Sequence, residues 1–129
     1  NKGFTLIELI LVIAILGILA AAVAPQFVDI QANAQQAQAD GMAGAIRDGI
    51  NMQFALTLAN TGTGTFPPLL DAASAGACAS GNACFDIVLQ QGLEDLWTFV
   101  SATEYTHDAT SRTYTYTPAD GTFQCTAGC

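Results

Sequence analysis

A single acidic side chain, that of Glu8, interrupts a long apolar run near the start of the sequence. The run extends from Phe4 to Ala24, hereafter the apolar segment, and reads FTLIELILVIAILGILAAAVA. An ionisable group inside such a segment costs free energy in a bilayer, so it usually has a role or a partner. A simpler interpretation places Glu8 near the membrane surface, where its charge interacts favourably with the positive end of the helix dipole.

Four cysteines form the second group of residues with chemical potential: Cys78, Cys84, Cys125 and Cys129. An even number of cysteines beside a membrane-targeting segment favours two disulfides formed outside the cytoplasm. Three connectivities are possible. The local pairs Cys78–Cys84 and Cys125–Cys129 are favoured because each closes a short segment at low entropic cost. Zinc is the weaker alternative, since neither pair has CxxC spacing and His107 lies away from both in sequence.

The remaining polar residues do not form a recognisable catalytic set. His107 has Asp108 beside it but no obvious nucleophile, so we expect a solvated histidine in a loop. Asp108 and Asp120 could help to bind calcium, but two carboxylates without a run of further ligands are a weak pattern for a calcium loop. The sequence has no phosphate-binding loop and no catalytic carboxylate pair. We therefore expect neither an enzyme nor a cofactor or metal site.

The charge balance argues against nucleic acid as a partner. The chain has 129 residues, enough for one domain, with three basic and eleven acidic residues and a formal net charge of −8. Binding to nucleic acid needs clustered Lys and Arg to displace phosphate counterions, and no such cluster is present. The acidity is better suited to keeping an exposed surface soluble.

Two kinds of helical pattern follow each other at the start of the chain. The apolar segment would span about 30 Å as a helix, which is the thickness of a bilayer core. After Pro25, Gln26–Ala59 is rich in good helix formers. Its apolar residues recur at four-residue steps, namely Met42, Ile46, Ile50, Phe54 and Leu58. These patterns predict one helix from about Phe4 to Ala59, with an amphipathic second half.

The C-terminal half predicts shorter elements. Thr61–Asn82 is typical of a loop, and Phe85–Leu93 has the apolar spacing of a short helix. Beyond it, aromatic and β-branched residues alternate with polar ones, as they do in strands. We expect three or four antiparallel strands that end at Cys125, including Trp97–Ser101 and Arg112–Thr117, with a tight turn at Asp120-Gly121.

The residues Gly3-Phe4-Thr5-Leu6-Ile7-Glu8, followed by Gly17 and Pro25 in an apolar helix, resemble the processing site and first helix of type IV pilins and their relatives. The close resemblance covers roughly residues 3 to 30. It implies cleavage between Gly3 and Phe4 by a prepilin peptidase, and methylation of the new amine of Phe4. It also implies an α+β fold, in which the C-terminal half of a long helix packs on a small antiparallel sheet.

The resemblance gives a role to each of the N-terminal residues. Glu8 of one subunit would meet the Phe4 amine of a neighbour in a filament, which would set the register and offset the burial of both charges. The helix would loosen between Gly17 and Pro25 after the subunit leaves the membrane; a gentle kink is the simpler alternative. Asn1–Gly3 look like the end of a basic leader. If that leader persisted, the amine and hence the pairing would not exist.

The domain plan follows the same resemblance. We expect a leader remnant (1–3), a transmembrane and filament-core half of the helix (4–25), an amphipathic half (26–59) and a loop and sheet (60–129). Such a subunit waits in the inner membrane and is assembled by the pilus machinery into an extracellular helical filament of identical subunits. The filament would support adhesion, motility or uptake.

Two rival functions remain open. The first is a type II secretion pseudopilin, which shares the N-terminal motif; the four cysteines and the lack of a clear calcium loop favour a pilin over it. The second is a membrane-anchored binding module that never polymerises.

Overall fold

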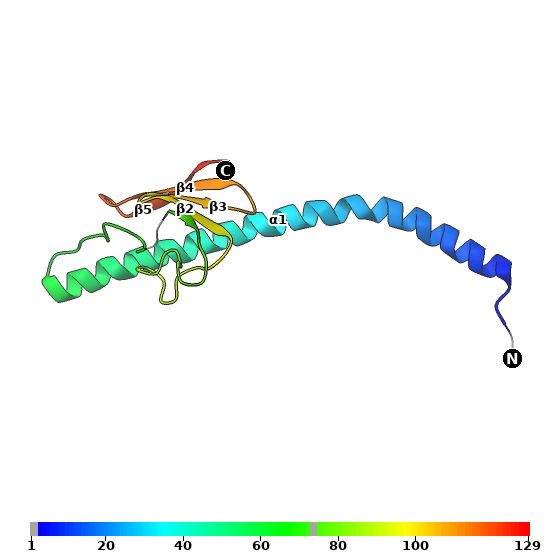
Figure 1. Cartoon of the computed structure of the whole chain (residues 1–129), viewed down its shortest axis with the longest axis horizontal. Helices are drawn as coiled ribbons and strands as arrows, with labels where there is room; N and C mark the ends of the chain where they lie inside the picture. The colour runs from blue at the N-terminus through cyan, green and yellow to red at the C-terminus, as the bar shows by residue number, and fades with distance from the viewer. Residues whose placement is uncertain (1–2, 73–74) are drawn as a thin grey trace. The chain divides into compact units, whose positions relative to one another are not determined.

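The chain folds into one long helix and one antiparallel sheet. The structure, a computed structural model, describes residues 3–72 and 75–129. Within these residues it contains α1 (Leu6–Thr61), β1 (Gly76–Ala77), β2 (Trp97–Ser101), β3 (Glu104–His107), β4 (Arg112–Thr117) and β5 (Thr122–Ala127) (Figure 1). The expected α+β fold is therefore confirmed. Asn1 and Lys2 of the expected leader remnant lie outside the described residues.

The chain divides into two units. The first ends at Ala34, and the second is Gln35–Cys129, hereafter the head. Helix α1 starts at Leu6 rather than at Phe4, and it ends at Thr61 rather than at Ala59. Its end is set by Gly62, which adopts a left-handed conformation (φ 73°) and donates its N–H to the carbonyl oxygen of Leu58 at 2.9 Å. Glycine is favoured at this position because it has no Cβ to clash.

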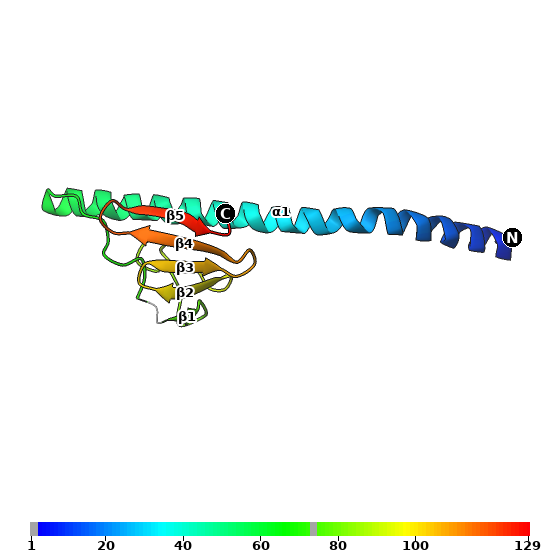
Figure 2. The same ribbon diagram turned by 90° about the horizontal axis from the view of Figure 1, so that it is seen from above.

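The five strands lie side by side in the order of the sequence, and each is antiparallel to its neighbour (Figure 2). The prediction of three or four strands falls short of these five, and it did not locate β1 or β3. Strand β1 has only two residues, and β3 has only four, Glu-Tyr-Thr-His, which give little alternating pattern. Strand β5 also continues past Cys125 to Ala127.

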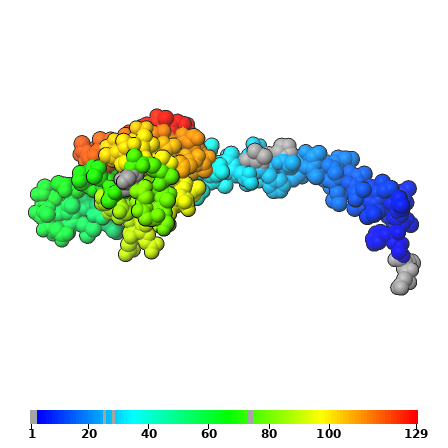
Figure 3. Space-filling view, in the orientation of Figure 1, coloured from blue at the N-terminus to red at the C-terminus, as the bar shows by residue number. Residues whose placement is uncertain are grey.

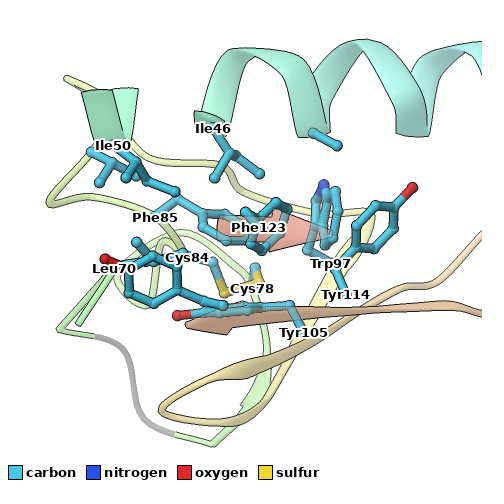
Figure 4. Packing of buried hydrophobic residues seen from close by; sticks show 13 residues of the cluster. Ile46, Ile50, Leu70, Cys78, Cys84, Phe85, Trp97, Tyr105, Tyr114 and Phe123 are labelled. Carbon is cyan, nitrogen blue, oxygen red and sulfur yellow. A yellow bond between two sulfur atoms is a disulfide. The ribbon is translucent and has the colours of Figure 1, made fainter. Parts of the chain in front are cut away.

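Aromatic rings fill the core of the head, between the sheet and the helix (Figure 4). Phe85 packs edge-on against Trp97 at 5.3 Å between ring centroids, and Tyr114 stacks on Phe123 at 5.4 Å. Helix α1 contributes four buried side chains from one of its faces: Ala39, Ala43, Ile46 and Ile50. The predicted apolar stripe is thus correct at its centre. Its end is not, because Leu58 remains 47% exposed.

The short helix expected at Phe85–Leu93 is absent, and the segment is a closed series of turns. Phe85 has a positive φ of 62°, which a helix does not allow. Cys84 and Leu93 exchange two backbone hydrogen bonds of 3.0 and 2.7 Å, which brings the two ends of the segment together. Burial of the Phe85 ring in the core outweighs the local helical spacing that the sequence shows.

The expectation of a solvated loop histidine at position 107 is also wrong. His107 ends β3 and is fully buried. Its ring packs edge-on against Trp97 at 5.1 Å between centroids, and its Nδ1 lies 3.0 Å from the hydroxyl of Thr110. The alternation of β3 explains this, because Tyr105 and His107 point to the same face of the sheet, and that face is the core.

Two glycines of α1 predict opposite outcomes when they are replaced by alanine. A Cβ at Gly49 would lie 2.3 Å from the backbone oxygen of Val88, whereas a Cβ at Gly44 would meet nothing within 4 Å. Gly49→Ala should therefore lower the free energy of unfolding by about 1 to 3 kcal/mol through overpacking. Gly44→Ala should raise it by about 0.5 to 1 kcal/mol through helix propensity. Urea unfolding of the detergent-solubilised chain measures both, and equal effects would contradict this packing.

The buried histidine predicts acid sensitivity of the head. Burial lowers the pKa of His107 below 6.5, and the neighbouring charges of Asp108 and Arg112 oppose each other. The unfolded chain then binds the proton more readily, so stability is full above about pH 6.5 and declines as the pH falls below that value. His107→Gln should lose less stability than the native chain between pH 7.5 and pH 5.5 in urea unfolding. If His107→Gln loses as much stability as the native chain over this pH range, a group other than His107 causes the acid sensitivity.

Candidate functional site

The N-terminal turn of α1 is closed by a reciprocal set of hydrogen bonds between Thr5 and Glu8. The Thr5 backbone N–H and the Thr5 hydroxyl both donate to Glu8 Oε2 at 2.9 Å. The Glu8 backbone N–H donates back to the Thr5 hydroxyl at 3.3 Å. This arrangement is a capping box, which satisfies N–H groups that a helix start leaves without partners. It fixes the rotamer of Glu8 on the first turn.

The capping role of Thr5 is absent from the sequence-based expectations. The signal was present, because a Thr followed three residues later by a Glu before an apolar run is a helix-start pattern. The expected interaction of Glu8 with the positive end of the helix dipole is compatible with this geometry. The capping box adds a specific partner to it.

The two oxygens of the Glu8 carboxylate differ in their surroundings. The hydrogen bonds that the backbone N–H and the hydroxyl of Thr5 donate both end on Oε2. Oε1 has no hydrogen-bond partner among residues 3–72 and 75–129, and no cation in that part of the chain pairs with the carboxylate. Capping therefore leaves one oxygen and the net negative charge of Glu8 available to another group.

Gly3 and Phe4 lie ahead of the helix and are exposed, with 88% of the Phe4 surface accessible. The peptide bond between them is therefore outside regular secondary structure. Gly17 lies within α1, and a Cβ there would meet nothing within 4 Å. The backbone of α1 is helical through Gly17 and position 25. Loosening between them concerns the assembled state and stays a prediction.

Every residue from Gly3 to Ala24 is exposed, although most of them are apolar (Figure 3). Helix α1 is long and apolar enough, by length and composition, to cross a membrane. Exposed apolar surface of this extent marks a contact with lipid or with protein. The large side chains concerned are Phe4, Leu6, Ile7, Leu9, Ile10, Leu11, Val12, Ile13, Ile15, Leu16, Ile18, Leu19 and Val23.

The cysteines form two local disulfides in the head. Cys78 and Cys84 are joined, with a Cα–Cα distance of 5.4 Å, and both are buried in the core. Cys125 and Cys129 are joined, with a Cα–Cα distance of 6.0 Å, at the end of β5. The first bridge fixes the loop before β2 against the core. The second closes the end of the chain onto β5.

Asp108 and Asp120 do not come together as a ligand set. Asp108 accepts a hydrogen bond from the hydroxyl of Thr98 at 2.8 Å, and Asp120 accepts two from Thr122 in its own turn. Among the residues that the structure describes, no group of three or more His, Cys, Asp or Glu side chains could hold a metal ion.

Comparison with known proteins places the N-terminal segment in a recognised class. Residues 1–24 match the family described as the prokaryotic N-terminal methylation motif. This match covers Gly3, Phe4, Glu8 and the whole of the apolar segment. No solved structure shows a significant match to the chain.

Curated relatives extend this result. The chain is 56% identical over 46 residues to the type IV narrow pilus major component PilA5 of Thermus thermophilus, covering 36% of this chain and 40% of that one. It is 56% identical over 39 residues to the type IV major pilin protein PilA of Myxococcus xanthus, covering 30% and 18%. It is 40% identical over 82 residues to the fimbrial protein EcpC of Eikenella corrodens, covering 64% and 48%.

The chain thus carries an N-terminal methylation motif on an exposed apolar helix, joined to an α+β head. The resemblance to type IV pilins is confirmed by the motif and by the curated pilin and fimbrial relatives. The matched regions span less than half of the length of each of these relatives. None of the relatives' names denotes an enzyme.

The capping box predicts a local effect of Thr5 on the start of the helix. Thr5→Ala removes the acceptor of the Glu8 backbone N–H, so the exchange of that amide with solvent should accelerate by about fivefold in detergent micelles. Thr5→Ser keeps the hydroxyl and should exchange as the native chain does. Hydrogen exchange followed by NMR measures the difference, and identical rates in all three proteins would rule out the cap.

Proposed function

We propose that the chain is the structural subunit of an extracellular type IV pilus, which polymerises through its apolar N-terminal helix. The observation that carries this proposal is the methylation motif at the start of a helix whose apolar side chains the chain leaves uncovered. In the precursor, lipid of the inner membrane would cover these side chains. In the filament, the helices of neighbouring subunits would replace the lipid.

Processing would prepare the subunit for assembly. The Gly3–Phe4 bond lies ahead of α1 and is exposed, as a peptidase requires of its substrate. Cleavage there would create a positive amine at Phe4, which the same machinery would methylate. A methylated amine keeps its charge, so it could still pair with a carboxylate.

Glu8 would accept this amine from a neighbouring subunit. The Thr5 bonds leave Oε1 free, so Glu8 could keep its cap and bind the amine at the same time. Two charges buried in a water-poor filament core are stabilised only when they pair closely. A subunit in the wrong register would leave both charges unpaired, so pairing with Glu8 would favour the correct register.

A glutamine at position 8 separates the charge of Glu8 from its capping role. Glu8→Gln can still complete a capping box but cannot form an ion pair. Fibres sheared from cells should fall by about tenfold or more, because an uncompensated amine would remain buried. The amount of subunit in the membrane should stay unchanged. Quantitative immunoblots of both fractions measure this, and normal fibre yield from Glu8→Gln would contradict a charge-based register.

The same preparation tests the two rival functions. Electron microscopy should show long surface fibres for a pilin, whereas a secretion pseudopilin would form only short periplasmic ones. A membrane-anchored binding module would form no fibre at all. If the chain were such a module, the Glu8→Gln variant and the native chain would give the same amounts of subunit in the sheared and membrane fractions.

A further inference from the structure

The head contains a polar cavity between α1 and the turn that joins β4 to β5. Its volume is about 400 Å³. Arg47 and Asn51 line it from α1, and the residues numbered 120–124 line it from the turn and β5. The lining offers one guanidinium, two side-chain amides, a hydroxyl and the carboxylate of Asp120, so it suits a small polar group that Arg47 can bind. None of the roles considered above uses this cavity.

Arg47 is held in place by its own chain. Its Nε donates a hydrogen bond to the backbone oxygen of Phe123 at 2.7 Å. Phe123 is a buried residue of the core, so this bond fixes the guanidinium relative to β5. The N–H groups on the two terminal nitrogens have no hydrogen-bond partner within residues 3–72 and 75–129. A planar fork of donors held in one orientation is suited to a carboxylate.

The cavity lining contains one carboxylate, that of Asp120, and it forms no ion pair with Arg47. Asp120 accepts bonds from the hydroxyl and the backbone N–H of Thr122, at 2.8 and 3.0 Å, and these bonds lower its pKa. The ion pair found in the described part of the chain joins Arg112 to Asp40 at 2.8 Å. Arg47 is therefore a cation of the head that has no carboxylate partner in that part of its own chain.

The charge of the whole chain points to the partner. The chain has eleven acidic and three basic residues, which give it a net charge of −8, so copies of the head repel one another. A fixed, unpaired arginine on such a surface is complementary to the chain's own acidic side chains. The head exposes several of these outside the cavity, namely Asp48, Asp86, Glu94, Asp95 and Asp108.

We propose that this cavity binds an acidic side chain from a second copy of the chain, through the guanidinium of Arg47. The contact would join heads in the filament and offset part of their repulsion. It rests on the proposed function, because it requires that the subunits polymerise. It is independent of Glu8, which acts at the other end of α1.

Removal of the Arg47 charge should weaken the contact between heads, but filaments should still form at their normal length. In Arg47→Gln filaments, the release of subunits into mild detergent at low salt should rise by up to about fivefold. Gln91→Glu is the matched control, because this substitution changes the net charge by the same amount. Gln91 is exposed and lies outside the cavity lining. The Gln91→Glu variant should release subunits like the native chain. Equal release from both variants would overturn the proposal.

Cross-linking identifies the partner directly. Cleavage after Gly3 would remove Lys2, the only lysine of the sequence, so R47K supplies the only lysine amine of the processed subunit. The Phe4 amine can also react, so native filaments set the background. A carbodiimide, which joins an amine to a carboxylate in contact with it, should convert R47K filaments to covalent dimers above that background. Mass spectrometry of the linked peptides would then name the acidic residue.

The outcomes separate this inference from the proposed function. If the native chain forms no fibres, the proposed function fails and takes this contact with it. If native fibres form but R47K gives no dimer above background, or links only to Asp120 of its own chain, the inference alone fails. A dimer linked through position 47 to an acidic residue of another copy supports it.

Discussion

The apolar surface between Leu6 and Val23 is the constraint on which the rest of the molecule depends. These side chains are exposed along α1, and the described part of the chain offers nothing to cover them. Water disfavours such a surface, so a stable state must cover it with lipid or with protein. The single carboxylate of Glu8 then becomes decisive, because in either environment it is the polar group that must find a partner.

The head has a different physical requirement from the apolar segment, because it must be stable in water with only a small core. The largest of the buried side chains that the structure describes are aromatic, and Ile46 and Ile50 of α1 pack into the same core. The Cys78–Cys84 bridge lies inside this core, while the Cys125–Cys129 bridge holds the end of β5. The same helix therefore contributes to the core of the head in one stretch of its sequence and exposes an apolar surface in another.

The helix and the strands of the sheet were predictable from the sequence where local pattern and burial agree, as they do at Ile46, Ile50 and β4. The pattern failed where tertiary contacts override it. Phe85 adopts a positive φ so that its ring can enter the core, which ends any helix there. His107 is buried because its register in β3 points it inward, and a lone histidine gives no such signal in the sequence.

In the candidate site, the sequence identified Glu8 because it is the acidic residue of an apolar segment. The three-residue spacing from Thr5 to Glu8 was enough to predict the capping box. The bond from Arg47 to Phe123 joins residues far apart in sequence, so no local pattern could reveal it.

The role proposed for Glu8 requires that a newly formed amine at Phe4 pairs with Glu8 of a neighbouring subunit. Intact mass spectrometry of subunits from purified surface fibres is the decisive measurement, because the amine exists only after cleavage. The subunit should begin at Phe4 and carry an added methyl group. A subunit in the fibre that still begins with Asn1, Lys2 and Gly3 would contradict it.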